Sequence, residues 1–191
     1  GPIKSALEGV GKAAAEVKKT GKLTRLQKEL RERGGEKQAQ RLERAADEIP
    51  GLERLFHSRG LIEAFQGSEG FPYQGVVTMR PGDYKNFSQP LEVDLSEGRQ
   101  GISPYSVQNI EDLRELIRRG RPFTSVPYLQ LDKKGPLTIV SGHEGRHRTR
   151  AMEAEDMPAT LVQVLPRHSL KFKDLRNPSP SEWRQKLSEA M

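Results

Sequence analysis

Apolar residues recur at helical spacing through the first quarter of the chain. Residues 3–48 contain no proline and are rich in Ala, Leu, Glu, Lys, Arg and Gln, which favour helices. One apolar stripe starts at Leu23 and a second at Leu42, on either side of Gly34-Gly35. We therefore expect two or three amphipathic helices in this region, and one more short helix within residues 51–71.

Short β-type runs alternate with helical patterns from Tyr73 onward. Interleaved strands and helices are typical of an α/β (α+β) domain, so we expect a small mixed sheet after the helical region. The expected strands cover residues 76–79, 128–131, 137–140 and 159–165. The expected helices are a short one entered through the turn "RPGDYKNF" (80–87), one over about 110–120 and one over 142–155. Residues 88–106 are expected to be loop.

These patterns divide the chain into a helical N-terminal region (1–72), a sheet domain (73–166) and a polar tail (167–191). The tail ends in a predicted helix in which Trp183 and Leu187 share one face. The opening Gly1-Pro2 has the form of a tag-cleavage scar, so we expect the natural chain to extend further upstream.

The composition narrows the classes of function. Cysteine is absent, which excludes disulfides, thiolate zinc sites and cysteine nucleophiles and is compatible with a reducing compartment such as the cytoplasm. No apolar run approaches the roughly 18 residues of a membrane span. The formal charge of +6 and the pI of about 9.6 favour an acidic partner such as a nucleotide or nucleic acid. The charged N-terminal helices are expected to be solvated, and they could also support self-association or a protein partner.

The stretch "IVSGHEGRHRTR", residues 139–150, carries the main candidate chemistry. His143 to His147 spell H-E-x-x-H, in which two histidines one helical turn apart hold zinc. His143 would lie in the first helical turn, where exposed N–H groups and the helix dipole disfavour a cation. Neighbouring arginines add to this repulsion, and Glu153 stands where a third histidine would be expected. A zinc hydrolase is therefore a second alternative.

A negatively charged group fits the same stretch better. Ser141 is placed to cap a helix, and Glu144, three residues later, would complete a capping box. Bare glycines and a helix N-terminus let an anion approach backbone N–H donors, and guanidinium groups match phosphate oxygens. His147 shares a stripe with Ala151 and is expected to point inward near the site. The predicted phosphate-binding residues are Ser141, Gly142, His143, Gly145, Arg146, Arg148 and Arg150.

The sequence "GRHRTRAMEAEDMPATLVQV", which begins at Gly145, resembles the signature of the ParB/sulfiredoxin superfamily. Partition proteins read G-E-R-R-x-R-A, which Gly145, Arg148, Arg150 and Ala151 match. Sulfiredoxins read G-C-H-R, but here Arg146 replaces the catalytic cysteine. The upstream "IEDLRELIRRGRPF" resembles the superfamily's helix before a conserved strand. The spelling "HEGRHR" is also similar to ParB-like domains of large phage and mobile-element proteins. The likeness covers about residues 73–165.

This resemblance implies a ParB/sulfiredoxin-like fold with a nucleoside triphosphate and a divalent metal, Mg²⁺, at the Gly/Arg turn. The arginines would hold phosphates, Glu144 would bind the metal or act as base, and His147 would orient the substrate or donate a proton. The implied activity is that of a metal-dependent nucleotide hydrolase, phosphotransferase or nuclease, acting in the cytoplasm of a cell or of a phage host. Because the cysteine and the E-N-x-x-R box of partition clamps are missing, a non-catalytic DNA- or nucleotide-binding module is the first alternative.

Overall fold

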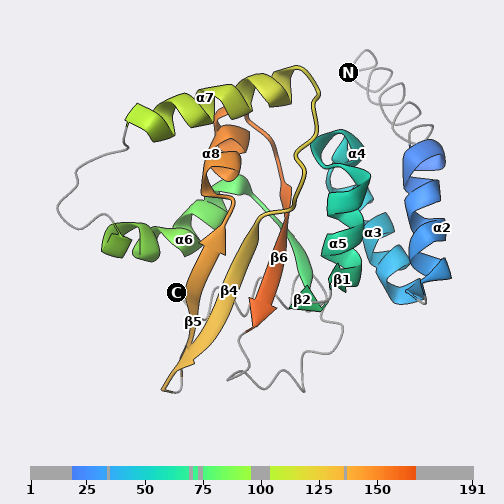
Figure 1. Cartoon of the computed structure of the whole chain (residues 1–191), viewed down its shortest axis with the longest axis horizontal. Helices are drawn as coiled ribbons and strands as arrows, with labels where there is room; N and C mark the ends of the chain where they lie inside the picture. Colours follow the sequence, from blue (N-terminus) through green and yellow to red (C-terminus); the bar gives the residue numbers. More distant parts are fainter. Residues whose placement is uncertain are drawn as a thin grey trace, which may run out of the picture.

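The computed structural model describes residues 19–33, 35–68, 71–72, 75–95, 104–135 and 137–166. Within these ranges, a group of N-terminal helices packs beside a four-stranded mixed sheet, and three further helices lie around that sheet (Figure 1). The expected α+β fold with a small mixed sheet and a helical N-terminal region is confirmed. The helix predicted around Trp183 lies outside the described residues.

The N-terminal helices bury the apolar stripes that the sequence pattern predicts. A π-helical turn, η1 (Lys19–Leu23), leads into α2 (Thr24–Glu32), α3 (Glu36–Glu48), α4 (Leu52–Leu55) and α5 (Ser58–Gln66). Leu26 and Leu30 of α2 pack into the same buried cluster as Leu42 of α3. Burial of these side chains is the main source of stability for helices of this length.

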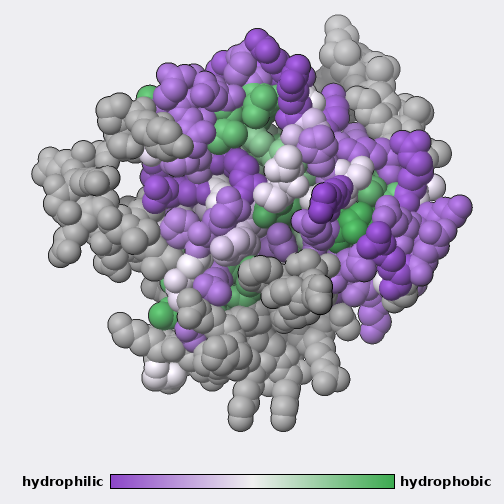
Figure 2. All heavy atoms as spheres, viewed as in Figure 1, coloured by the Kyte–Doolittle hydropathy of each residue, from purple (hydrophilic) through white to green (hydrophobic). Residues whose placement is uncertain are grey.

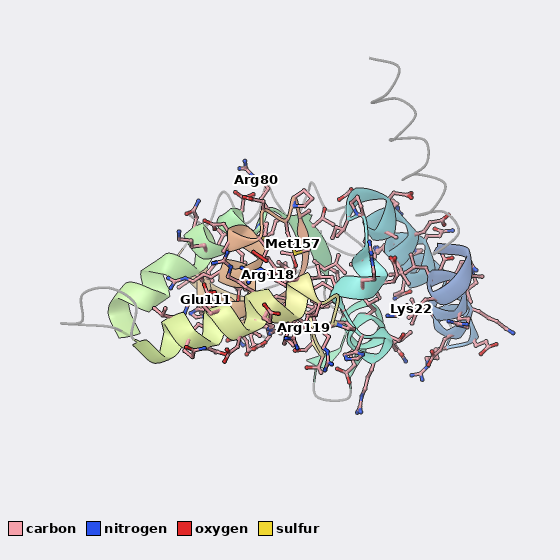
Figure 3. All side chains as sticks on the ribbon, turned by 90° about the horizontal axis from the view of Figure 1, so that it is seen from above. Lys22, Arg80, Glu111, Arg118, Arg119 and Met157 are labelled. Atoms are coloured by element: carbon pink, nitrogen blue, oxygen red, sulfur yellow. The ribbon has the colours of Figure 1, made fainter. Side chains whose placement is uncertain are left out.

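Lys22 joins the start of this region to α4. Its ammonium group donates to the backbone carbonyls of Glu53 at 2.5 Å and Phe56 at 3.3 Å, at the end of α4 where carbonyl groups lack helical partners (Figure 3). Burial lowers the pKa of Lys22, and the neighbouring Glu53 carboxylate opposes that shift. Lys22 therefore acts as a helix cap within the fold.

The central sheet has the strand order β3-β6-β4-β5. β3 (Val76–Met79) is antiparallel to β6 (Thr160–Pro166), β6 is parallel to β4 (Tyr128–Lys134), and β4 is antiparallel to β5 (Leu137–Glu144). The predicted β4–β5 hairpin is thus confirmed. Its register shifts at Ser141, which is an extra residue between Val140 and Gly142 and forms a β-bulge. A separate small ladder joins β1 (Gly67–Ser68) to β2 (Phe71–Pro72).

Helices pack against both faces of the sheet. On one face, apolar residues of all four strands pack with Tyr84 and Phe87 of α6 (Pro81–Leu95). On the other face, Val76 and Leu161 join the core of the N-terminal helices. α8 (Arg146–Ala154) contacts both α6 and α7 (Pro104–Arg118), beside the end of β5 (Figure 1). The junction between β5 and α8 is therefore enclosed by helices that are distant in sequence.

The N-terminal helices and the sheet share one hydrophobic core. The backbone N–H of Phe123, just before β4, donates to the carbonyl of Leu55 at 2.8 Å, and the N–H of His57 donates to the carbonyl of Phe123 at 2.9 Å. The rings of Phe56 and Phe123 lie 6.4 Å apart. The core is therefore continuous across residue 72, where the sequence pattern changes from helices alone to alternating strands and helices.

Two predictions of element bounds are wrong: the loop over residues 88–106 and the start of α8. α6 continues past Pro90 to Leu95 and α7 already begins at Pro104, although residues 88–106 were expected to be loop. Proline disfavours a helix interior only locally, and the packing of α6 on the sheet and on α8 outweighs that preference. The second error concerns the start of α8, which lies at Arg146 instead of near Gly142.

The surface of the described part is largely polar. Figure 2 shows hydrophilic side chains over α2 and α7 and only small hydrophobic areas on the visible face. Among the described residues, Val107 is the large apolar side chain that stands out, at 50% exposure. None of the helices in these ranges combines the length and the apolar character needed to cross a membrane.

Candidate functional site

Gly145 forms the turn between β5 and α8. Its φ of +116° is a backbone conformation that L side chains rarely adopt, and it stands at the N-cap of α8. A Cβ atom at this position would lie 2.6 Å from Cβ and 3.0 Å from Cα of Pro127. The site therefore needs glycine for two separate reasons, the backbone conformation and the close approach of the segment before β4.

A pocket of 440 Å³ opens at this turn. The continuous run from His143 to Arg148 lines it from one side, and Asn109 and Leu113 of α7 line it from the other. The structure thus brings most of the predicted site residues together at one pocket. Ser141, Gly142 and Arg150 are not among the residues that line it.

The predicted capping box at Ser141 is wrong. Ser141 and Glu144 both belong to β5, and Tyr128 of β4 is the register partner of Glu144. The Ser141 hydroxyl donates instead to the carbonyl of Gln130 at 3.5 Å, a long hydrogen bond. Strand pairing satisfies the backbone as far as Glu144, so the helix cannot begin before Gly145. The bulge at Ser141 and the close contact of Gly142 with the Gln130 side chain are features of the hairpin.

Arg148 is held firmly within the protein. One terminal nitrogen donates to the backbone carbonyl of Ser125 and, at 2.9 Å, to its hydroxyl, while the other donates to the Glu144 carboxylate. The Arg148 side chain is 12% exposed, whereas that of Glu144 is 53% exposed. Arg148 therefore fixes the segment before β4 to the pocket, and Glu144 compensates part of its charge.

His147 connects α8 to α7. Its Nδ1 lies 2.8 Å from Nδ2 of Asn109, and its Nε2 lies 3.1 Å from Oγ of Ser106. With the Asn109 amide oriented in this way, Nδ2 donates to Nδ1, and the ring proton sits on Nε2 and is donated to Ser106. His147 therefore faces α7, and Asn109 and Ser106 both lie on one face of that helix.

The helical zinc arrangement of the H-E-x-x-H spelling does not form. His143 lies in β5 and pairs with Leu129, whereas His147 lies in α8 beyond the Gly145 turn. The two histidines therefore do not share a helical face, which that motif requires. Among the described residues, no group of three or more His, Asp or Glu side chains is placed to hold a metal ion.

Tyr84 of α6 anchors the end of the hairpin. Its fully buried hydroxyl lies 2.9 Å from the carbonyl of Glu144 and 3.0 Å from that of Tyr128. Burial raises the pKa of Tyr84, and the Glu144 carboxylate raises it further, so the hydroxyl stays protonated and donates to these carbonyls. Tyr84 thus fixes the strand end from which the pocket residues project.

An ion-pair cluster holds the other end of α8 against α7. Glu155 bonds to Arg114 at 3.2 Å and to Arg118 at 2.5 Å. In Figure 3, Arg118 lies on the side of α7 nearer to α8, and Arg119 on the opposite side. Partial burial would raise the pKa of Glu155, but the hydrogen bonds from Arg118 and Arg114 outweigh it, and the pKa is lowered. α7 is therefore attached to α8 at two places, at His147 beside the pocket and at Glu155 at the end of α8.

A second hollow, of 530 Å³, lies between the start of α6 and the end of α8. Its basic side chains are matched by acidic ones: Arg80 bonds to Asp83 at 3.1 Å, and Lys85 lies 3.7 Å from Glu153. Because opposite charges alternate there, this hollow has no evident preference for an anion.

Several residues of the site carry no signal in the motif. Ser106 and Asn109 lie about 40 residues upstream, Ser125 lies between α7 and β4, and Tyr84 belongs to α6. The one sequence signal for these residues is the spacing of Asn109 and Leu113, which are four residues apart and so share a face of α7. Comparisons with protein-family models, with curated proteins and with solved structures give no match for this chain.

Proposed function

We propose that this domain binds the phosphate groups of a nucleotide in the pocket between β5, α7 and α8. The observation that carries the proposal is the lining of one pocket by the unbroken run from His143 to Arg148, at the start of a helix. The first N–H groups of α8 have no acceptor within the helix and attract negative charge. Arg146 and Arg148 bring two positive charges to the lining of the pocket, and Glu144, which pairs with Arg148, compensates one of them.

The size of the pocket favours a nucleotide over an extended nucleic acid. A volume of 440 Å³ falls within the range of roughly 300–1,000 Å³ that is usual for small-molecule sites. Leu113 provides an apolar wall for a base, and Asn109 an amide beside it. The net charge of +6 would attract polyanions from a distance and raise the association rate for any phosphate ligand.

We further propose that Mg²⁺ enters with a nucleoside triphosphate, as the ParB/sulfiredoxin resemblance implies. Mg²⁺ is usually held by one or two carboxylates together with substrate phosphates. Among the described residues of the pocket, Glu144 supplies the one carboxylate, and its side chain is 53% exposed. Glu144 would hold the ion, which would neutralise phosphate charge during hydrolysis or phosphoryl transfer.

A non-catalytic binding module is the alternative, and one contact favours it. The Glu144 carboxylate already pairs with Arg148, so a base or metal ligand at Glu144 would have to exchange that partner. A binding module predicts nucleotide affinity without turnover in Mg²⁺ or Mn²⁺, and affinity for DNA that falls steeply with salt if nucleic acid is the ligand.

The test compares two arginines of the same helix. Arg146 lines the pocket and Arg150 does not, although both carry the same charge and have a buried Nε atom. Isothermal titration with ATP, CTP and GTP, with and without Mg²⁺, is expected to show about 10- to 100-fold weaker binding for Arg146→Ala, the effect of losing one charge-assisted hydrogen bond. Arg150→Ala should change affinity by less than about threefold. Equal losses in both variants, or no nucleotide binding by the wild type, would contradict the proposal.

A further inference from the structure

We propose that Ser106 is a phosphoryl acceptor in this protein and that His147 is the base that activates it. The inference rests on the proposed function, because the nucleoside triphosphate in the pocket would be the phosphoryl donor. It adds a modification site on α7 that the sequence motif does not contain.

The geometry of three side chains carries this inference. Ser106 and Asn109 are three residues apart on α7, so they lie on one face of that helix. The imidazole of His147 lies between them, with Nε2 3.1 Å from the serine oxygen and Nδ1 2.8 Å from the asparagine amide. A hydroxyl, an imidazole and a group that orients the imidazole form the arrangement that activates serine nucleophiles.

This role requires the other neutral tautomer of His147, with the ring proton on Nδ1, together with a half-turn of the Asn109 amide. Rotation of that amide by half a turn presents Oδ1, which accepts a hydrogen bond from Nδ1–H of His147. Nε2 then has a lone pair and accepts the proton of the Ser106 hydroxyl. Both orientations fit the same heavy-atom distances, so no movement of α7 or α8 is needed.

The serine is next to the place where phosphates are proposed to bind. His147 and Asn109 both line the pocket, and Ser106 is half-buried against the imidazole on the α7 side. Neighbouring serines have other contacts: the Ser125 hydroxyl accepts from Arg148, and the Ser141 hydroxyl donates to a backbone carbonyl. Neither of these hydroxyls faces a base, so Ser106 is the acceptor that the geometry favours.

The transfer step is balanced with the donor alone. Oγ of Ser106 forms a bond to the terminal phosphorus, and the bond from that phosphorus to the bridging oxygen breaks. The hydroxyl proton passes to Nε2 of His147, and the nucleoside diphosphate leaves with the bridging oxygen. Arg146 and the first N–H groups of α8 would stabilise the charge on the transferring group.

The experiment follows the phosphoryl group and the nucleotide separately. The full chain is incubated with Mg²⁺ and each of ATP, CTP and GTP labelled on the terminal phosphate, and the modified residue is located by peptide mass spectrometry. Label is expected on Ser106, at background level in Ser106→Ala, and unchanged in the control Ser141→Ala. His147→Gln keeps hydrogen-bonding groups but no base, and its labelling rate at saturating nucleotide should fall by about 100-fold or more.

Binding by titration distinguishes failure of this inference from failure of the proposed function. If a nucleotide binds and Arg146→Ala weakens that binding, but no label reaches Ser106, the inference is overturned and the phosphate site stands. If label appears on another residue and persists in Ser106→Ala, the inference is also wrong. If no nucleotide binds, the proposed function and the inference fall together. Thermal unfolding of Ser106→Ala and His147→Gln shows whether each variant is folded, and Ser106→Thr, which keeps the hydroxyl, should retain labelling.

Discussion

Replacement of Gly145 by alanine tests the packing on which the pocket depends. The added Cβ would lie 2.6 Å from Cβ of Pro127, closer than such atoms approach in folded proteins, and φ is +116°. A side chain in this backbone region costs about 1–3 kcal/mol, and overpacking against a buried proline costs about 1–3 kcal/mol more. The combined loss of unfolding free energy is therefore expected to be roughly 2–6 kcal/mol.

Gly135 provides the matched control for this measurement. It also has a positive φ, +61°, but a Cβ added there would have no atom within 4 Å. Gly135→Ala should therefore lose only about 1 kcal/mol, the cost of a left-handed conformation for an L residue. Urea denaturation of the wild type and both variants gives the free energies, and equal slopes show that the unfolded states are comparable.

The difference between the two variants measures the contact with Pro127 together with the extra backbone cost of a φ of +116° over one of +61°. If Gly145→Ala and Gly135→Ala lose the same free energy, the contact between Gly145 and Pro127 contributes nothing, and the reasoning from close approach is refuted. If Gly145→Ala is the less stable of the two but still binds nucleotide as the wild type does, the turn supports the fold without shaping the pocket.

Two further predictions concern the surroundings of the site. Glu155→Gln should be less stable than the wild type at neutral pH. The gap should close as pH falls, because folding lowers the pKa of Glu155, and the resulting stability is present above the unfolded pKa of about 4.3 and is lost as pH falls below it. Melting temperatures of the two proteins that stay parallel from pH 7 to pH 3 would contradict this. Gly60→Ala places a Cβ 2.6 Å from the carbonyl oxygen of Thr124, beside Ser125, which holds Arg148, so this variant should lose both nucleotide affinity and stability. In the control Gly21→Ala the added Cβ has no atom within 4 Å, and neither quantity should fall. Titration and urea denaturation of both variants decide this.

The sequence predicts those parts of the fold that depend on local spacing. The stripes around Leu26 and Leu42 have a helical period, and burial of one helical face requires only that period. The hairpin between Tyr128 and Val140 likewise follows from two β-type runs around a tight turn. The strand order could not be predicted in this way, because the pairing of β6 with both β3 and β4 joins segments far apart in the chain.

The wrong start predicted for α8 also results from contacts between segments that are far apart in the chain. The apolar pattern does not distinguish the end of β5 from the start of α8, since Ser141 and Glu144 have the spacing of a capping box. What decides the boundary is the pairing of Glu144 with Tyr128 and the approach of Pro127 to Gly145. Both contacts come from residues that precede the motif by more than ten positions, and the bulge at Ser141 has no clear sequence signature.

Two residues of the motif, Gly145 and Arg148, have a role in the fold that their contacts explain. Gly145 is required by its φ and by Pro127, and Arg148 by its bonds to Ser125 and Glu144. A resemblance based on the Gly-x-x-Arg spacing alone therefore has an explanation in folding. A functional argument must depend on Arg146, which lines the pocket at the start of α8, and on the contact of His147 with a hydroxyl of α7. Substitutions at Gly145 or Arg148 would change stability and ligand binding at once, so ligand binding is tested at Arg146 and Ser106, with the free energy of unfolding of each variant measured beside it.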